Sequence, residues 1–154
     1  MRIYTIGHST KSEFELARKL KKYHIDVLVD VRSVPFSSYN PQFNRFHLAS
    51  FLEKQGFQYI WKGKNLGGKY GKEGNESYDE NVDWLLKIAE NDNVCIMCSE
   101  GNYKQCHRHQ MIEPDLFEKA DDDFDIYHIG WSKDHHYGRA MVKGVQTQQK
   151  LFKF

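Results

Sequence analysis

The sequence predicts an α/β fold with a mainly parallel sheet of about five strands and helices on both faces. Two observations lead to this prediction. Short apolar runs alternate along the chain with segments whose apolar residues recur at helical spacing. One run, Val27 to Val29, is continuously apolar, which is typical of a strand buried on both faces. With right-handed crossovers, this alternation gives a Rossmann-like, three-layer domain.

The length of 154 residues suits one domain with one hydrophobic core. We assign residues 1–130 to this α/β domain. From Trp131 onward the chain is polar and basic with few apolar residues, so we expect 131–154 to be a tail that is irregular or ordered only by contact with something else.

The first half of the chain begins with a strand at Ile3–Ile6. Ser12 and Glu15 form a capping box, which predicts the start of a helix running to Tyr23. The following elements are a strand over Ile25–Val31 and a helix over Phe46–Gln55, which Gly56 ends.

The second half begins with a strand at Phe57–Ile60 and a loop from Trp61 to about Asn75, whose five glycines argue against regular structure. The remaining predicted elements are a helix at Ser77–Glu90, a strand at Val94–Met97, a helix at Cys106–Glu118 and a strand at Asp125–Ile129. Pro114 is expected to interrupt the last helix, because proline removes a backbone hydrogen bond.

Charge and cysteine content limit the classes of partner. The net charge of +1 argues against a protein that coats nucleic acid by bulk charge, although Lys62–Lys72 is a local basic patch. The chain begins directly with a strand-like run, and no apolar stretch is long enough to span a bilayer. With three cysteines, an odd number, we expect a cytoplasmic protein with free thiols and no membrane partner.

Reactive side chains follow four of the predicted strands. The loops after parallel strands meet at one edge of the sheet, where α/β folds usually place their sites. We therefore predict a shared pocket that contains His8, Ser9, Asp30, Arg32, Trp61, Cys98 and Glu100.

The predicted catalytic residues are Cys98, Glu100, His8 and Asp30. A thiol that lies just past a buried strand and near arginine or histidine has a lowered pKa, which favours Cys98 as a nucleophile. The alternative for Cys98 is a small buried hydrophobic residue. Glu100 and Asp30 act either as proton-transfer groups or as members of structural ion pairs.

The predicted substrate is an anion. Arg32 and Arg108 suit a phosphate or carboxylate by forked hydrogen bonding, and the helix from Cys106 adds backbone donors. His107, Trp61 and Ser9 complete the predicted substrate-binding set. A phosphatase loop is disfavoured because Lys104 stands where its arginine is needed, and no Walker loop is present.

Two other classes of function stay open. Cys98 and Cys106, with His107 and His8 nearby, are possible metal ligands of a metal or redox protein, although their spacing is not that of a zinc knuckle. A non-enzymatic nucleic-acid or protein-binding module is the other, because Trp61 and Tyr70 are interleaved with lysines. The sequence does not specify a cofactor or an oligomeric state.

Four segments together resemble a known family, namely Tyr4–Thr10, Asp30–Pro35, Tyr59–Gly68 and Cys98–Arg108. The family is the prokaryotic domain of unknown function numbered four hundred eighty-eight. The resemblance implies a small Rossmann-like domain but no reaction, and it covers roughly residues 1–130. Pro114 and the segment 131–154 depart from the family's pattern. The signature positions that it implies here are His8, Asp30, Arg32, Cys98, Glu100, Cys106, His107 and Arg108.

Overall fold

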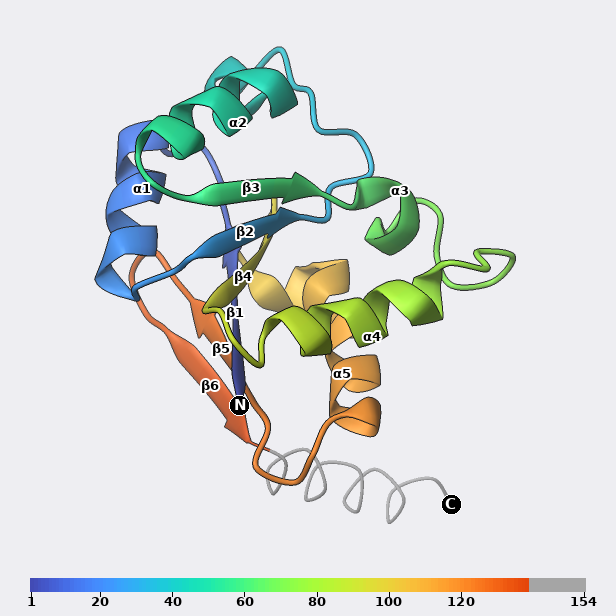
Figure 1. The fold of residues 1–154 in the computed structure, drawn as a ribbon. Coiled ribbons are helices and arrows are strands. Elements are labelled where there is room, and N and C mark those ends of the chain that lie inside the picture. Colours follow the sequence, from blue (N-terminus) through green and yellow to red (C-terminus); the bar gives the residue numbers. More distant parts are fainter. Residues whose placement is uncertain (139–154) are drawn as a thin grey trace.

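A computed structural model describes residues 1–138 of the chain (Figure 1). Its strands are β1 (Arg2–Gly7), β2 (Val27–Asp30), β3 (Gln58–Trp61), β4 (Val94–Cys98), β5 (Asp125–Ile129) and β6 (His135–Gly138). Its α-helices are α1 (Glu13–Lys22), α2 (Arg45–Lys54), α3 (Gly63–Leu66), α4 (Tyr78–Ile88) and α5 (Glu113–Lys119). Three short turns complete the elements: η1 (Pro41–Phe43), η2 (Tyr103–Gln105) and the π-helical η3 (Arg108–Ile112).

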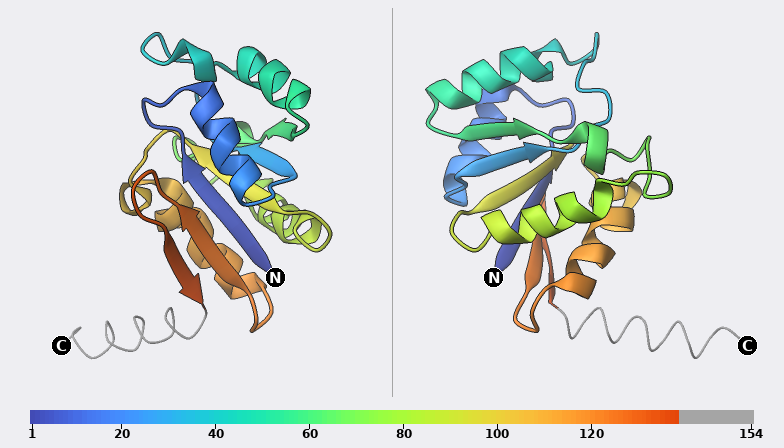
Figure 2. Two further views of the ribbon diagram at one scale, coloured as in Figure 1. Left: turned by 90° about the vertical axis from the view of Figure 1, so that its left-hand side faces the viewer. Right: turned by 45° about the vertical axis from the view of Figure 1, so that its right-hand side comes forward.

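The strands form one sheet in the order β3-β2-β4-β1-β5-β6. All neighbouring pairs among β1 to β5 are parallel, and β6 runs antiparallel to β5, as the views in Figure 2 show. The predicted α/β class and mainly parallel sheet are therefore confirmed, and the described part of the chain has six strands instead of about five.

Two local expectations need correction, and a third, the interrupted helix after Cys106, is confirmed. The segment after Trp131 is not wholly irregular, because His135–Gly138 forms β6 by backbone pairing with β5; residues 139–154 lie outside the described residues. The glycine-rich loop contains one turn of helix, α3. The helix after Cys106 is divided into η3 and α5, and Pro114 lies in the first turn of α5, where the missing N–H is not needed.

Alternate strand residues enter two apolar clusters, because successive side chains of a strand point to opposite faces. One cluster joins Val27, Val29 and Ile96 to the inner residues of α4 and α5. The other joins Leu28 and Met97 to the inner residues of α1 and α2. Packing against these helices therefore holds the strands whose carboxyl ends carry the loops of the candidate site.

The carboxyl ends of the parallel strands are tied together by hydrogen bonds. The His8 backbone N–H donates to the Cys98 carbonyl at 2.9 Å, which joins the ends of β1 and β4. The indole N–H of Trp131 donates to the Gly7 carbonyl at 2.7 Å, which adds the end of β5. Within the described residues, none of the helices has the length and apolar character to cross a membrane.

Candidate functional site

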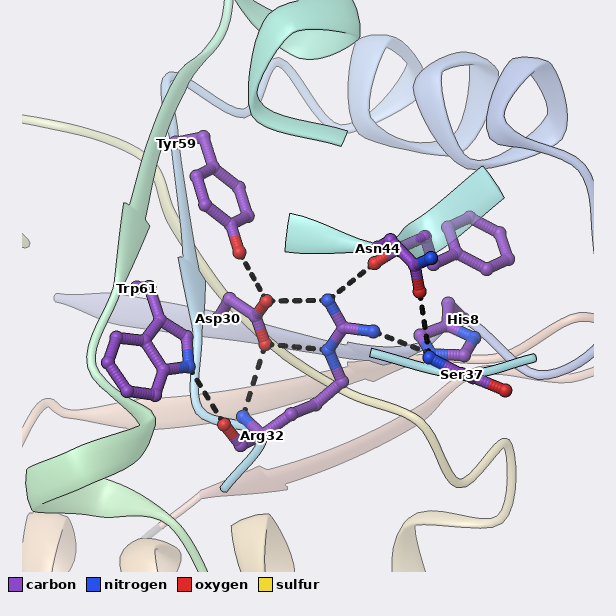
Figure 3. Close-up of polar contacts among 8 residues, drawn as sticks. His8, Asp30, Arg32, Ser37, Asn44, Tyr59 and Trp61 are labelled. Atoms are coloured by element: carbon purple, nitrogen blue, oxygen red, sulfur yellow. Dashed lines mark hydrogen bonds and ion pairs between the residues drawn. The ribbon is translucent and has the colours of Figure 1, made fainter. Parts of the chain in front are cut away.

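Asp30 and Arg32 form a buried ion pair at the end of β2 (Figure 3). The Arg32 guanidinium donates to both Asp30 oxygens, from Nε at 2.9 Å and from Nη2 at 2.7 Å, and Nη2 also donates to the Phe43 carbonyl at 2.7 Å. The Tyr59 hydroxyl donates to the same carboxylate. Asp30 is 0% and Arg32 6% exposed, so both charges depend on each other for stabilisation.

His8 joins this network from the end of β1. Arginine only donates, so the contact of 3.3 Å between Arg32 Nη1 and His8 Nε2 makes Nε2 the acceptor. The other nitrogen, Nδ1, then donates to the Ser9 carbonyl at 2.7 Å. The ring is therefore neutral and stacks on Phe43 with centroids 4.2 Å apart. Burial is the main cause that lowers the pKa of His8 below its ordinary value of 6.5.

Cys98, Cys106 and His107 form a second cluster on the β4–η3 connection. Nδ1 of His107 lies 3.8 Å from the sulfur of Cys98 and 3.8 Å from that of Cys106. Hydrogen bonding with Cys106, opposed by burial and assisted by His107, lowers the pKa of Cys98 below its ordinary value. The same hydrogen bond and burial raise the pKa of Cys106. The cluster therefore pairs a thiolate with a thiol.

A chain of hydrogen bonds runs from Arg108 to Glu113. Nε of Arg108 donates to the Thr5 hydroxyl at 3.2 Å, and this hydroxyl lies 2.5 Å from Nδ1 of His128. Nε2 of His128 lies 3.2 Å from Oε1 of Glu113, whose other oxygen bonds His109. An ionised carboxylate only accepts, so His128 donates through Nε2. The Thr5 hydroxyl accepts from Arg108, so its own proton is free to donate to Nδ1 of a neutral His128 ring.

The pKa values in this chain agree with that assignment. Burial outweighs the hydrogen bond to Glu113 and lowers the pKa of His128 below 6.5. Burial raises the pKa of Glu113, but the hydrogen bonds from His109 and His128 outweigh burial and lower this pKa below its ordinary value of 4.5. At neutral pH the pair is therefore a neutral imidazole and a carboxylate.

These two buried histidines make the fold sensitive to acid. His8 and His128 have lowered pKa values in the folded protein, so below about pH 6.5 the unfolded chain binds more protons and stability falls. We expect the free energy of unfolding, measured by urea denaturation, to decrease from about pH 7.5 to about pH 5.5. His128→Gln should flatten this dependence, and His47→Gln, at a side chain 57% exposed, should not. Identical pH dependence in all three proteins would refute the assignment.

A cavity of about 400 Å³ opens at the same edge, between the η2 turn and the β5–β6 connection. Its charged or protonatable lining groups are Lys104, Lys133, His128 and His135, and no carboxylate lines it within the described residues. Tyr103 and Trp131 contribute aromatic surface, and Tyr103 stacks on His128 at 4.1 Å. The lining therefore favours an anionic, partly aromatic ligand.

The remaining predicted residues lie around these clusters. The exposed Glu100 accepts the Asn102 backbone N–H at 3.0 Å, and its own carbonyl accepts from Arg108 at 2.7 Å. The indole of Trp61 donates to the Arg32 carbonyl at 2.9 Å, and the Arg45 guanidinium covers its ring. Ser9 has a positive φ of 53° and bonds the β4 loop through its backbone. Arg32 and Arg108 are both buried and hydrogen-bonded within the fold.

The structure also places residues at this candidate site that the sequence did not indicate: Thr5, Glu113, His128, Tyr103, Lys104 and Lys133. The signal that was present is the position of His128 in β5. His128 lies two residues after Ile126, so its side chain points to the same buried face of the strand. A polar side chain therefore occupies a position where an apolar one is expected.

Comparison with known proteins bears on this geometry. The family model described as Domain of unknown function DUF488 matches residues 13–74, which include Asp30, Arg32 and Trp61. The matched segment covers less than half of the chain and ends before Cys98. Comparisons with curated proteins and with solved structures gave no match. The family match confirms the resemblance predicted from the sequence over residues 13–74.

Proposed function

We propose that the protein is an enzyme that acts on a nucleotide or a related phosphorylated molecule bound at the carboxyl edge of the sheet. The observation that supports this proposal is the lining of the cavity beside β5, which combines Lys104 and Lys133 with Trp131 and Tyr103 and contains no carboxylate within residues 1–138. Lysines attract phosphate, and aromatic rings stack on bases. The proposal also includes the finer Rossmann-like, three-layer arrangement, which the two apolar clusters support.

The buried Arg32 and Arg108 hold the loops at the carboxyl edge of the sheet by hydrogen bonds. Arg108 donates to the carbonyl of Glu100, and the next residue, Gly101, lines the cavity. Arg32 holds the end of β2 through Asp30. In this proposal the arginines position the loops, and the exposed lysines contact the phosphate. This differs from the direct anion contacts by Arg32 and Arg108 that the sequence suggests.

The reactive group in the proposal is the Cys98 thiolate. It is the last residue of β4, packed with Cys106 and Ile112, and it lies three residues before Gly101 of the cavity without lining the cavity itself. A buried thiolate reacts with electrophiles or binds metals. This chemistry supports an enzyme over a passive binding module.

Adenosine 5′-monophosphate is a suitable probe of the cavity, with adenosine as its uncharged counterpart. We expect the nucleotide to bind more tightly than adenosine in isothermal titration calorimetry. The double change Lys104→Gln, Lys133→Gln should weaken nucleotide binding by about 10–100-fold, because hydrogen bonds to charged groups contribute about 1.5–3 kcal/mol. Binding of adenosine should change little.

Lys54→Gln is the matched control, since this exposed lysine lies at the end of α2 and does not line the cavity. Equal affinity for the nucleotide and adenosine would overturn the proposal. Equal weakening by the control and by the double change would overturn it as well.

A second candidate function rests on a neighbouring basic surface. Lys11, Lys19 and Trp131 line a further cavity together with Glu15, Arg18 and Lys22, and Lys11 and Lys19 lie over the Trp131 ring. A lysine-rich surface around a half-buried aromatic ring suits single-stranded nucleic acid. This candidate is favoured if a short single strand binds far more tightly than the mononucleotide and with a steep salt dependence.

A further inference from the structure

Cys98, Cys106 and His107 bring three metal-binding atoms together. Their two sulfurs and one ring nitrogen all lie within 4.8 Å of one another. Three neighbouring elements supply them: the end of β4, the residue after η2, and the residue before η3. Both cysteines are free and buried. The fold therefore holds two thiols and an imidazole in a fixed arrangement.

The spacing of these atoms fits tetrahedral zinc. With Zn–S of about 2.3 Å and Zn–N of about 2.05 Å, the edge from sulfur to nitrogen is about 3.6 Å and the edge from sulfur to sulfur about 3.8 Å. Both sulfur–nitrogen distances in the cluster are 3.8 Å. The two sulfurs lie within 4.8 Å of each other. Small side-chain shifts would therefore suffice to place one ion among the three atoms.

The orientation of His107 supports the same interpretation. Its Nδ1 faces both sulfurs, and its Nε2 is buried without a hydrogen-bond partner among the described residues. Contacts from Nδ1 to sulfur at 3.8 Å are weak hydrogen bonds. A metal bond at Nδ1 would be the stronger interaction for this nitrogen.

The backbone of Gly68 closes over this ring. A Cβ atom at position 68 would lie 3.0 Å from Cγ of His107. A glycine there lets the loop after α3 approach the imidazole and hold its orientation.

We infer that Cys98, Cys106 and His107 form a binding site for Zn²⁺. Two thiolates and an imidazole select a borderline-soft cation over Mg²⁺ or Ca²⁺, which prefer oxygen. The group contains three residues in the described part of the chain, and residues 139–154 contain no Cys, His, Asp or Glu. Three protein ligands leave the fourth position to water or a substrate, as in catalytic zinc sites. Binding converts the thiol of Cys106 to a thiolate and releases its proton to solvent.

Cobalt is the probe, because tetrahedral Co²⁺ with thiolate ligands absorbs in the visible and near ultraviolet, whereas Zn²⁺ is silent. The full chain is reduced, stripped with a chelator and titrated with Co²⁺. We expect saturation at one ion per chain, with thiolate-to-cobalt absorption, and displacement of Co²⁺ by Zn²⁺. Cys106→Ser and His107→Gln should each weaken binding by more than the roughly 10–100-fold typical of outer-shell changes.

Cys95→Ala is the matched control, because Cys95 is the third cysteine and belongs to the apolar cluster of α1 and α2. It should retain the full absorption. Far-ultraviolet circular dichroism shows which variants remain folded, and Cys98→Ser provides a further ligand variant. No cobalt uptake by the folded, reduced wild type would overturn the inference, as would unchanged absorption in folded Cys106→Ser and His107→Gln. Nucleotide binding by metal-free protein tests the proposed function separately, since the three ligands do not line that cavity.

Discussion

Asp30→Ala is expected to lower the free energy of unfolding by about 3–5 kcal/mol, because it leaves the charge of Arg32 buried and unpaired. The carboxylate accepts two hydrogen bonds from the guanidinium and a third from the Arg32 backbone N–H at 3.1 Å. None of these donors reaches water readily, since Arg32 is nearly enclosed. Urea denaturation at neutral pH measures the loss.

The surface pair of Arg2 and Asp125 provides the control. It has the same forked geometry, with Nε 2.7 Å from Oδ1, but its side chains are 39% and 22% exposed. Solvent screens such pairs, so Asp125→Ala should cost no more than about 1 kcal/mol. Tyr59→Phe removes one hydrogen bond from Asp30 and should cost about 1 kcal/mol. Wild-type stability in Asp30→Ala would contradict a structural role for the pair.

Gly7→Ala is expected to destabilise the protein by at least about 1–3 kcal/mol and to disrupt the carboxyl edge. A Cβ atom at this position would lie 1.8 Å from the carbonyl oxygen of Glu100 and 2.9 Å from Cα of Gly101. Both contacts are with backbone, which has no rotamer to change. The end of β1 and the loop after β4 would therefore have to separate.

Moving these backbones apart would disturb both the hydrogen bond from Arg108 and the lining of the cavity. The Glu100 carbonyl accepts from Arg108, and Gly101 lines the cavity. We expect Gly7→Ala to lose affinity for adenosine 5′-monophosphate in calorimetry, besides its lower unfolding free energy. Gly138→Ala is the control, since a Cβ there meets nothing within 4 Å. A Gly7→Ala variant with unchanged stability and affinity would refute the close contact between these loops.

The strong local signals of the sequence predicted most of the fold. Ser12 accepts the backbone N–H of Glu15 at 3.1 Å, as the capping box requires, and β5 has the predicted bounds Asp125–Ile129. Two elements without such a signal were missed. The strand β6 is short and polar, and it exists through pairing with β5, which local composition does not encode. The helix α3 is a single turn between glycines.

For the site, the sequence predicted that His8, Asp30 and Arg32 meet, but not what their side chains face. His8, Asp30 and Arg32 come together because parallel strands end at one edge. That Arg32 turns inward to Asp30 and the Phe43 carbonyl depends on the packing of η1, which periodicity does not reveal. Their catalytic and substrate-binding roles remain predictions, as does the role of Cys98.

The most direct measurement is a crystal structure of the protein with adenosine 5′-monophosphate at a saturating concentration. We predict the phosphate in contact with Lys104 and Lys133, and the base against Trp131 or Tyr103, in the cavity beside β5. Nucleotide bound instead in the separate cavity lined by Trp61 and Tyr70 would contradict the account. An empty cavity at that concentration would contradict it equally.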